Sequence, residues 1–298
     1  MTGADPQGLS QLRRPTVSVI LPFLGGLDEA REVVRSLEAL EIAPGDELIV
    51  ADNTPDSVAE AAAEDSPVLV AIAGDTRSAS HARNIGANRA TGEWFLFVDD
   101  DCVLPADILD RYFEPAPDDR CGIAAGEIVG DPGQRGVLPA WARSRRGKWV
   151  RHHLDSGPHP GGITANLLVR RCVWEELGGF QLGGGGDLDL CWRAQDAGWG
   201  FEYRPDVVVI HRDRDSVRTL VGQAFSYGSH GRHLQALHGS SVERARLVVP
   251  LVRSLASFVS WLSKRQPRQA LFSLIDGLWA FFYWLGDRTA GRGARRAD

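Results

Sequence analysis

The chain has 298 residues, of which 43% are hydrophobic and 24% are charged, and its formal net charge at pH 7 is -6. This composition is typical of a globular protein with one large domain, or one domain and an appendage, and the negative charge argues against general nucleic-acid binding. The four cysteines lie far apart with no C-x-x-C spacing, which predicts free thiols in a reducing compartment. The first residues lack an apolar signal segment, so a cytoplasmic location is expected.

Short apolar segments alternate with helical segments over the first hundred residues. Residues 1–14 are polar and are expected to form a disordered tail. Strands are predicted at 17–21, 48–51, 68–72 and 94–98, and helices between them at 28–40, 57–64 and 78–89. This alternation indicates βαβ units, and hence an α/β fold with a mainly parallel sheet covered by helices on both faces. The loops at the carboxyl ends of the strands are expected to converge on one site.

Three consecutive carboxylates, Asp99, Asp100 and Asp101, follow the predicted strand at 94–98. Adjacent carboxylates repel one another and raise each other's pKa, so they need a compensating cation. Because ligands bind at this edge of an α/β sheet, the cluster favours a hard divalent metal that holds phosphates. The alternative is that Asp101 caps a helix starting near Pro105, which accounts for one acid of the three.

Two other loops of the first half carry polar side chains suited to a nucleotide. Asp52 ends the second strand, where it either accepts from a base or ribose or forms an Asx turn before Pro55. Arg83 and Asn84 precede the acidic strand, and the arginine either forks onto a diphosphate or is a solvated surface residue. Neither G-x-G-x-x-G nor G-x-x-x-x-G-K-[ST] follows the first strand, so a metal and basic side chains would have to meet the charge of a diphosphate.

A basic-aromatic stretch opens the second half of the chain, after a predicted strand at 121–129. It contains Trp141, Trp149 and four basic residues. We predict a loop here, which either folds over a bound nucleotide or is an ordinary exposed excursion. A further strand is predicted at 167–169, directly after Asn166.

Four consecutive glycines, 183–186, predict a mobile or tightly turned loop before a helix at 188–197. Asp187 lies at the start of that helix, where it either caps the helix or acts as a general base facing an acceptor. His211 ends the next predicted strand. It is either structural or a ligand that completes a metal site begun by Asp101.

The last part of the chain differs in charge and pattern, with ten basic and four acidic residues from Ser241 onward. A helix broken near its glycines is predicted at 218–238, close enough in sequence to lie over the site. Two apolar segments follow at 247–262 and 270–285, each shorter than the ~20 apolar residues that span a bilayer. They are predicted either as an interfacial amphipathic hairpin on an anionic leaflet, or as a helical pair packed on the catalytic domain or on a second subunit.

Four segments, in this order, resemble the family 2 glycosyltransferases: VSVILPF, ARNIGANRATGEWFLFVDDD, VWEELGGF and GDLDLCWRAQDAGWGFEYRPDVVVIH. The resemblance covers about residues 17–211. It implies a Rossmann-like GT-A catalytic domain at 15–212, with a nucleotide-sugar half at 15–103 and an acceptor half at 104–212. The remainder, 213–298, is then a C-terminal helical appendage.

The resemblance also implies roles for individual residues. Contacts to the donor nucleotide fall on Pro22, Asp52, Arg83, Asn84, Asp99 and Asp100. Ligands for Mn²⁺ or Mg²⁺ fall on Asp99, Asp101 and His211, the general base on Asp187, and acceptor contacts on Asn166, Asp189, Trp192 and Arg193. Gly186 departs from the family pattern, in which an acid usually stands there, and this affects the acceptor contacts and the orientation of Asp187.

Together these roles imply an inverting transfer of a sugar from a nucleoside diphosphate donor, with UDP-sugars favoured, to a hydroxyl acceptor. The acceptor is left open among a saccharide, a lipid-linked molecule, a natural product and a peptide. Two alternatives remain: a nucleotide-sugar-binding scaffold without activity, for which Gly186 is the hint, and a nucleotidyltransferase, which should carry a glycine-rich first loop. The expected location is the cytoplasm or the inner face of the cell membrane, with 241–298 as the membrane contact or a homodimer surface.

Overall fold

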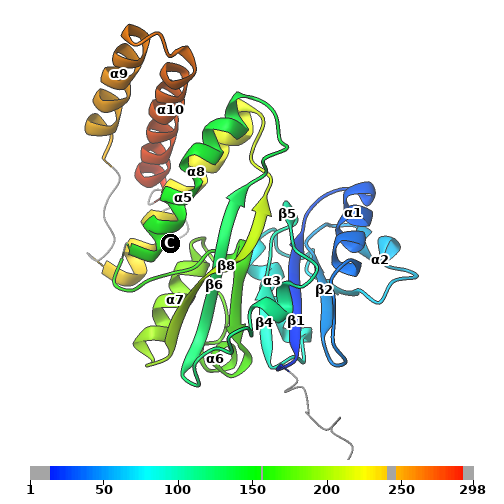
Figure 1. The fold of residues 1–298 in the computed structure, drawn as a ribbon. Coiled ribbons are helices and arrows are strands. Elements are labelled where there is room, and N and C mark those ends of the chain that lie inside the picture. The colour runs from blue at the N-terminus through cyan, green and yellow to red at the C-terminus, as the bar shows by residue number, and fades with distance from the viewer. Residues whose placement is uncertain (1–13, 156, 240–245, 291–298) are drawn as a thin grey trace, which may run out of the picture.

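A single mixed sheet forms the centre of the chain. The structure, a computed structural model, describes residues 14–155, 157–239 and 246–290. Within them, eight strands are arranged in the order β3-β2-β1-β4-β7-β6-β8-β5 (Figure 1). The strands are β1 (Val17–Phe23), β2 (Glu47–Asp52), β3 (Leu69–Ile72), β4 (Trp94–Phe97), β5 (Cys102–Val103), β6 (Cys121–Gly130), β7 (Leu167–Arg170) and β8 (Gly200–His211). The first four strands pair in parallel, as the alternation of short strands and helices predicts.

Helices lie on both faces of the sheet, and a hairpin of two helices stands away from it (Figure 1). They are α1 (Leu27–Glu38), α2 (Val58–Ala62), α3 (Ala79–Arg89), α4 (Ile108–Arg111), α5 (Val137–Asp155), α6 (Arg171–Leu177), α7 (Gly186–Asp196), α8 (Val217–His238), α9 (Val248–Ser263) and α10 (Pro267–Thr289). The hairpin is formed by α9 and α10.

Side chains of the central strands alternate between two cores, as they must in extended backbone. Val19 and Leu21 of β1 belong to a buried cluster with α1, α2 and α4, whereas Ile20 belongs to a second cluster with α3, α6 and α7. Phe97 of β4 joins the second cluster, where its ring centroid lies 5.3 Å from that of Trp174. Burial on both faces explains why the strand before the acids is a nearly continuous apolar run.

The second half of the sheet brings the end of β8 to the acids that follow β4. β7 runs antiparallel to both β4 and β6, while β6 and β8 are parallel. The short strand β5, directly after the acids, pairs antiparallel with β8 and sets Cys102 opposite His211. The register of this one pairing therefore places His211 beside Asp101.

The predicted break in the helix at 218–238 is wrong, because α8 is continuous. A Cβ added at Gly228 would lie 1.8 Å from the carbonyl oxygen of Tyr283 in α10, and one added at Gly286 would lie 2.0 Å from that of Phe225 in α8. The two helices cross backbone to backbone, so no larger residue fits at either glycine. These glycines serve helix packing.

The predicted loop at 141–149 is also wrong, because this stretch lies within α5. Trp141 is buried and donates its indole N–H to Asp276 of α10 (2.8 Å), and Arg145 donates twice to the same carboxylate (3.0 and 2.6 Å). The rings of Trp149 and Trp279 stack with centroids 5.3 Å apart. The stretch is therefore a helix held by α10, and its tryptophans pack on the C-terminal region.

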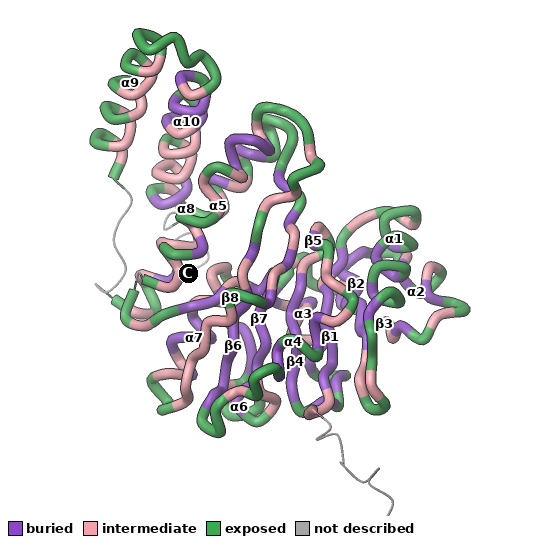
Figure 2. The backbone as a smooth tube through the Cα atoms, in the orientation of Figure 1, coloured by how far each residue is buried: buried purple, intermediate pink, exposed green. Residues whose placement is uncertain are grey.

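The α9–α10 hairpin is attached to the rest of the chain through α10, which crosses α8 and contacts α5. In α9, by contrast, no residue is buried, and its surface is exposed or half-buried along its whole length (Figure 2). None of the helices in the described ranges is long and apolar enough to cross a membrane.

Two smaller predictions concern the N-terminus and the cysteines. Residues 1–13 of the predicted tail lie outside the described residues, but Arg14 is held in ion pairs with Asp46 (2.7 Å) and Asp110 (2.5 Å). The four cysteines are free thiols, as predicted, and three of them are buried.

Candidate functional site

The acidic cluster lies where β4 ends and the chain turns into β5. Asp99, Asp100 and Asp101 precede β5, and α4 starts only after Asp107, so the alternative in which Asp101 caps a helix is wrong. Burial and the neighbouring carboxylates raise the pKa of Asp100 and that of Asp101 to about 6. This edge of the sheet therefore carries negative charge that the surrounding protein does not fully compensate.

His211 lies against the last of these acids. Its Nε2 is 3.3 Å from Oδ1 of Asp101, and the residue is only 9% exposed. Burial and the nearby Arg146 guanidinium lower the pKa of His211 to about 4, so the imidazole is neutral at physiological pH. A neutral imidazole next to a carboxylate is a donor pair that divalent transition metals accept.

Three arginines approach the same edge from three different elements. Arg83 of α3 forms an ion pair with Asp99, Arg214 after β8 reaches Oδ2 of Asp101 (3.4 Å), and Arg146 of α5 contacts Nδ1 of His211 (3.2 Å). The Nε atoms of Arg83 and Arg146 are buried and have no hydrogen-bond partner within the described residues. Unsatisfied guanidinium donors beside carboxylates suit an anionic ligand such as a diphosphate.

The predicted metal ligands are brought together only in part. Asp101 and His211 are in contact, whereas Asp99 is paired with Arg83, and no group of three His, Cys, Asp or Glu side chains within the described ranges is close enough to hold a metal ion. The chemistry of the Asp101–His211 pair fits Mn²⁺ or Mg²⁺, with the remaining positions left to ligand oxygens and water. The assignment of Asp99 as a ligand stays a prediction.

The glycine loop before α7 is a tight turn pressed against α8. Gly183, Gly184 and Gly185 all have positive φ, and a Cβ added at Gly184 would lie 2.0 Å from the ring of His230. Only glycine fits such a backbone at such a distance. The helix α8 therefore lies over this loop, whereas its position over the donor site stays a prediction.

Asp187 occupies the first turn of α7, directly after the loop. It is half-buried, and its Oδ1 accepts from the backbone N–H of Leu188 (3.0 Å), while Gly185 is the N-cap residue. Burial raises the pKa of Tyr227 on α8 and lowers that of His230, and the negative charge of Asp187 acts on both groups as a smaller influence. Asp187 is therefore close enough to α8 for its charge to act on these two side chains.

Gly186 is closely surrounded. A Cβ there would lie 3.3 Å from both the carbonyl oxygen of Gln181 and Oγ of Ser80, and 3.5 Å from Cβ of Phe180. An acid at this position, which is the usual family residue, would require small shifts of these neighbours. The packing around Gly186 therefore differs from one that accommodates an acid.

Two of the predicted nucleotide contacts already bind protein groups. Asp52 is fully buried and accepts from the backbone N–H of Thr54 (2.8 Å) and of Ala59 (2.7 Å), which is the Asx turn with a link to α2. Asn84 exchanges two hydrogen bonds with the backbone of Phe180 (2.9 and 3.0 Å) and fastens α3 to the turn after α6. Pro22 lies near the end of β1, half-buried.

The predicted acceptor residues are buried and engaged within the protein. Asn166 donates to the carbonyl oxygens of Glu127 (3.0 Å) and Val207 (2.9 Å). Asp189 is 1% exposed and binds Arg193 (2.7 Å) and His238 of α8 (2.9 Å). These contacts hold β6, β8, α7 and α8 together.

Trp192 of α7 is also internal. It lies 2% exposed, and its ring packs edge-on against His238, with centroids 5.0 Å apart. The acceptor roles of these four residues stay predictions, because the structure shows them in structural contacts.

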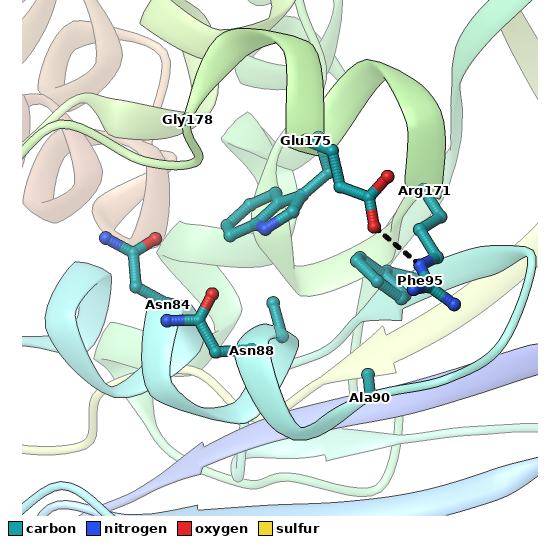
Figure 3. A pocket seen from close by; sticks show the side chains of 9 residues that line it. Asn84, Asn88, Ala90, Phe95, Arg171, Glu175 and Gly178 are labelled. Carbon is teal, nitrogen blue, oxygen red and sulfur yellow. Dashed lines mark hydrogen bonds and ion pairs between the residues drawn. The ribbon is translucent and has the colours of Figure 1, made fainter.

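A cavity of about 370 Å³ lies between α3 and α6 (Figure 3), and neither Asp101 nor His211 is among the residues that line it. Asn84, Asn88, Arg171 and Glu175 line it, with the Arg171–Glu175 ion pair (2.8 Å) on one side. Of the predicted site residues only Asn84 reaches it, so it is separate from the acidic edge.

Asp213 and Arg214 are not among the site residues predicted from the sequence, and Arg146 enters the prediction only as part of a basic stretch. Arg146 forms an ion pair with Asp213, which is 7% exposed, and its position beside His211 depends on the packing of α5 against β6, whose last residue pairs with His211. The alternating charges directly after His211, Arg-Asp-Arg-Asp, are a local signal that was present in the sequence.

This arrangement places the chain among the α/β proteins that bind ligands at the carboxyl ends of their strands. Residues 18–178 match the model of Glycosyl transferase family 2, and the chain belongs to this family.

Two curated relatives illustrate the similarity. The chain is 23% identical over 273 residues to the pre-mycofactocin glycosyltransferase of Mycobacterium tuberculosis, a match that covers 88% of this chain and 55% of that protein. It is 29% identical over 228 residues to the succinoglycan biosynthesis protein ExoM of Rhizobium meliloti, covering 71% of this chain and 73% of that protein. The chain thus spans about half the length of the first relative.

Solved structures show the same fold. The mannosyltransferase PcManGT from Pyrobaculum calidifontis, in complex with GDP-Man and Mn²⁺, superposes with a TM-score of 0.60 at 17% identity, over 96% of this chain and 77% of that one. Glucosyl-3-phosphoglycerate synthase from Mycobacterium tuberculosis, with Mn²⁺, UDP-Glc and glycerol 3-phosphate, gives 0.53 at 17% identity, over 76% and 80%. These likenesses confirm the predicted GT-A fold, a mixed, mainly parallel sheet flanked by helices and followed by a helical region.

Proposed function

We propose that this protein transfers a sugar from a nucleoside diphosphate donor to a hydroxyl acceptor, with inversion at the anomeric carbon. The observation that carries the proposal is the contact of Asp101 with His211 at the carboxyl edge of the sheet, beside guanidinium donors that lack partners. Membership of Glycosyl transferase family 2 supports the same reaction class.

The donor diphosphate is assigned to the edge formed by the acidic cluster and its arginines. A divalent cation, Mn²⁺ or Mg²⁺, would be held by Asp101 and His211 and, when bound, would act as a Lewis acid on the diphosphate leaving group. Both solved relatives were captured with Mn²⁺, one with GDP-Man and one with UDP-Glc. We favour a UDP-sugar for this chain and place the nucleotide near Pro22, Asp52 and Asp100.

Binding of a divalent cation would change which ring nitrogen of His211 carries the proton. Arg146 is a donor, so in the present contact Nδ1 accepts and Nε2 carries the proton that faces Asp101. Ligation through Nε2 requires the proton on Nδ1. The Oδ2 atom of Asp213 is buried without a partner within the described residues, and it is the acceptor that we assign to that proton.

Asp187 is assigned as the general base. Its carboxylate would take the proton from the acceptor hydroxyl while the hydroxyl oxygen attacks the anomeric carbon on the face opposite the leaving group. Such proton removal contributes about 10²–10⁴-fold to a rate, so positioning and charge stabilisation at the diphosphate supply the rest. The side chains of Tyr227 and His230 on α8, on which the Asp187 charge acts, would border the acceptor.

The substitution Asp187→Asn tests this role. We expect donor binding, measured by calorimetry with Mn²⁺, to stay within about twofold, and transfer to fall by about 10²–10⁴-fold. Asp196→Asn, at the exposed end of the same helix, is the matched control and should retain activity. Transfer by Asp187→Asn at the parental rate would require another base.

A nucleotide-sugar-binding scaffold without activity is the second candidate, because Gly186 stands where the family usually has an acid. Release of nucleoside diphosphate from a panel of UDP- and GDP-sugars with Mn²⁺ separates the two, since a scaffold releases none. The acceptor is a hydroxyl compound, and a saccharide, a lipid-linked molecule, a natural product and a peptide are the classes to screen.

A further inference from the structure

The helix α9 is apolar on both of its long faces, but only one of them is covered. Leu251 and Ser254 turn toward α10, where a Cβ at Gly277 would lie 3.8 and 3.3 Å from them. On the adjacent face six large apolar side chains are between 49% and 72% exposed: Val248, Val249, Val252, Leu255, Val259 and Leu262. Positions 248, 252, 255, 259 and 262 form one stripe along the helix.

This exposure is unusual within the molecule. The longer helix α8 has four exposed large apolar residues, whereas the 16 residues of α9 have six. A helix that is apolar all round is normally buried, so the free face of α9 indicates a surface that is covered in use. Figure 2 shows this helix at the far side of the hairpin, with nothing among the described residues on its outer face.

The charge around this face is entirely positive. From Arg246 to Ile275 the sequence has five basic residues and no acid: Arg246, Arg253, Lys264, Arg265 and Arg268. All five are exposed. The Nζ of Lys264 lies 4.9 Å from the ring centroid of Trp261, which places an aromatic ring beside a cation at the end of the apolar stripe. Trp and Lys in this combination are typical of a membrane–water boundary.

A second copy of the chain fits this face poorly. In a two-fold dimer with antiparallel helices, Lys264 and Arg265 of one copy would approach the N-terminus of the other α9, which carries positive partial charge. In a parallel arrangement each basic residue would lie opposite the same residue of the second copy, and the like charges would repel. An anionic surface, in contrast, complements both the apolar stripe and the five charges.

We propose that α9 and the turn into α10 form a docking surface for a membrane leaflet that contains anionic phospholipid. The stripe from Val248 to Leu262 enters the boundary between headgroups and acyl chains, and the basic side chains lie at the level of the phosphates. Arg253, in the middle of the helix, reaches the same level by extending its side chain along the helix surface. The interaction is peripheral.

Co-sedimentation of the full chain with vesicles tests this surface without reference to catalysis. We expect binding to vesicles of equal parts phosphatidylcholine and phosphatidylglycerol, weak binding to phosphatidylcholine alone, and a decrease with rising salt. The double substitution Val252→Glu with Leu255→Glu should reduce binding more than tenfold. The pair Arg253→Gln with Lys264→Gln should reduce it about fivefold per charge, on the anionic vesicles only.

Val217→Glu is the matched control, because Val217 is 56% exposed in the first turn of α8, where an acid is tolerated. It should bind vesicles as the unsubstituted chain does, and circular dichroism should show the same helix content for every variant. Equal binding to both kinds of vesicle, or full binding by the double variant, would refute the proposal. A dimer that Val252→Glu with Leu255→Glu dissociates, together with absent vesicle binding, would assign the face to a second copy instead.

Discussion

The acidic edge makes an unusual prediction for Asp101→Asn: in the absence of divalent metal, the substitution should stabilise the protein at neutral pH. Burial and the Asp99 charge raise the pKa of Asp101 from 3.8 to about 6, so the native state holds its proton more tightly than the unfolded chain does. Through linkage, the raised pKa of Asp101 contributes stability to the native state that is present below about pH 4 and is lost as the pH rises through 6.

The size of the effect follows from the same two pKa values. At pH 7.5 the ionised Asp101 costs the native state about 3 kcal/mol relative to its ordinary pKa, which is an upper bound, and an amide never ionises. We therefore expect Asp101→Asn to gain about 1–3 kcal/mol at pH 7.5 and almost nothing at pH 4. Each kcal/mol corresponds to about 2–4 °C in Tm for a chain of this size.

Urea and thermal unfolding in EDTA, and again with Mn²⁺, measure both halves of the reasoning. Mn²⁺ should stabilise the unsubstituted protein at pH 7.5 and progressively less below pH 6, because protons compete for the Asp101 carboxylate. The variant should show no Mn²⁺ effect. Glu41→Gln, at an exposed carboxylate in the loop between α1 and β2, is the control and should change neither quantity. A variant that is less stable than the parent in EDTA at pH 7.5, or one that Mn²⁺ still stabilises, would refute the reasoning.

Two further predictions concern the C-terminal helices. Gly228→Ala should lower the free energy of unfolding by about 2–4 kcal/mol, because its Cβ would lie 1.8 Å from the carbonyl oxygen of Tyr283. In the same helix, a Cβ at Gly222 meets nothing within 4 Å, so Gly222→Ala should raise the free energy of unfolding by about 0.5–1 kcal/mol. Equal effects of the two substitutions in urea unfolding would contradict the packing of α8 on α10. Asp276→Ala removes the acceptor shared by an indole and a guanidinium of α5, so it should lower the free energy of unfolding by about 1–3 kcal/mol and make proteolysis of α10 faster. An unchanged cleavage rate would show that this carboxylate does not hold the hairpin in place.

The first half of the fold could be predicted because its signals are local. Short apolar strands that end in Asp52 and in the acidic cluster alternate with helical segments. This alternation is compatible with few topologies besides a parallel sheet, and all four predicted strands are present. The interpretation of His211 as a metal ligand also anticipated its contact with Asp101, although the pairing that achieves this contact runs through the two-residue strand β5.

The misread segments depend on contacts between residues far apart in the sequence. The stretch around Trp141 contains a proline and a glycine and has no single apolar stripe, so its helix is stabilised by α10, more than a hundred residues later. The glycines of α8 weaken a helix by propensity, and only the crossing with α10 explains them. The ion pair of Asp189 with His238, on another helix, likewise could not be predicted from the sequence around Asp189.

The crossing at Gly228 and Gly286 has a consequence for where this protein can be cut. A fragment ending at the end of the central sheet, near His211, would lose α8 and with it the imidazoles that pack against the glycine loop before Asp187. A fragment ending after α8 would leave a groove of bare backbone in water where α10 had lain. We therefore expect the smallest fragment that folds cooperatively to extend through Thr289, so that the helical hairpin and the central sheet melt as one unit.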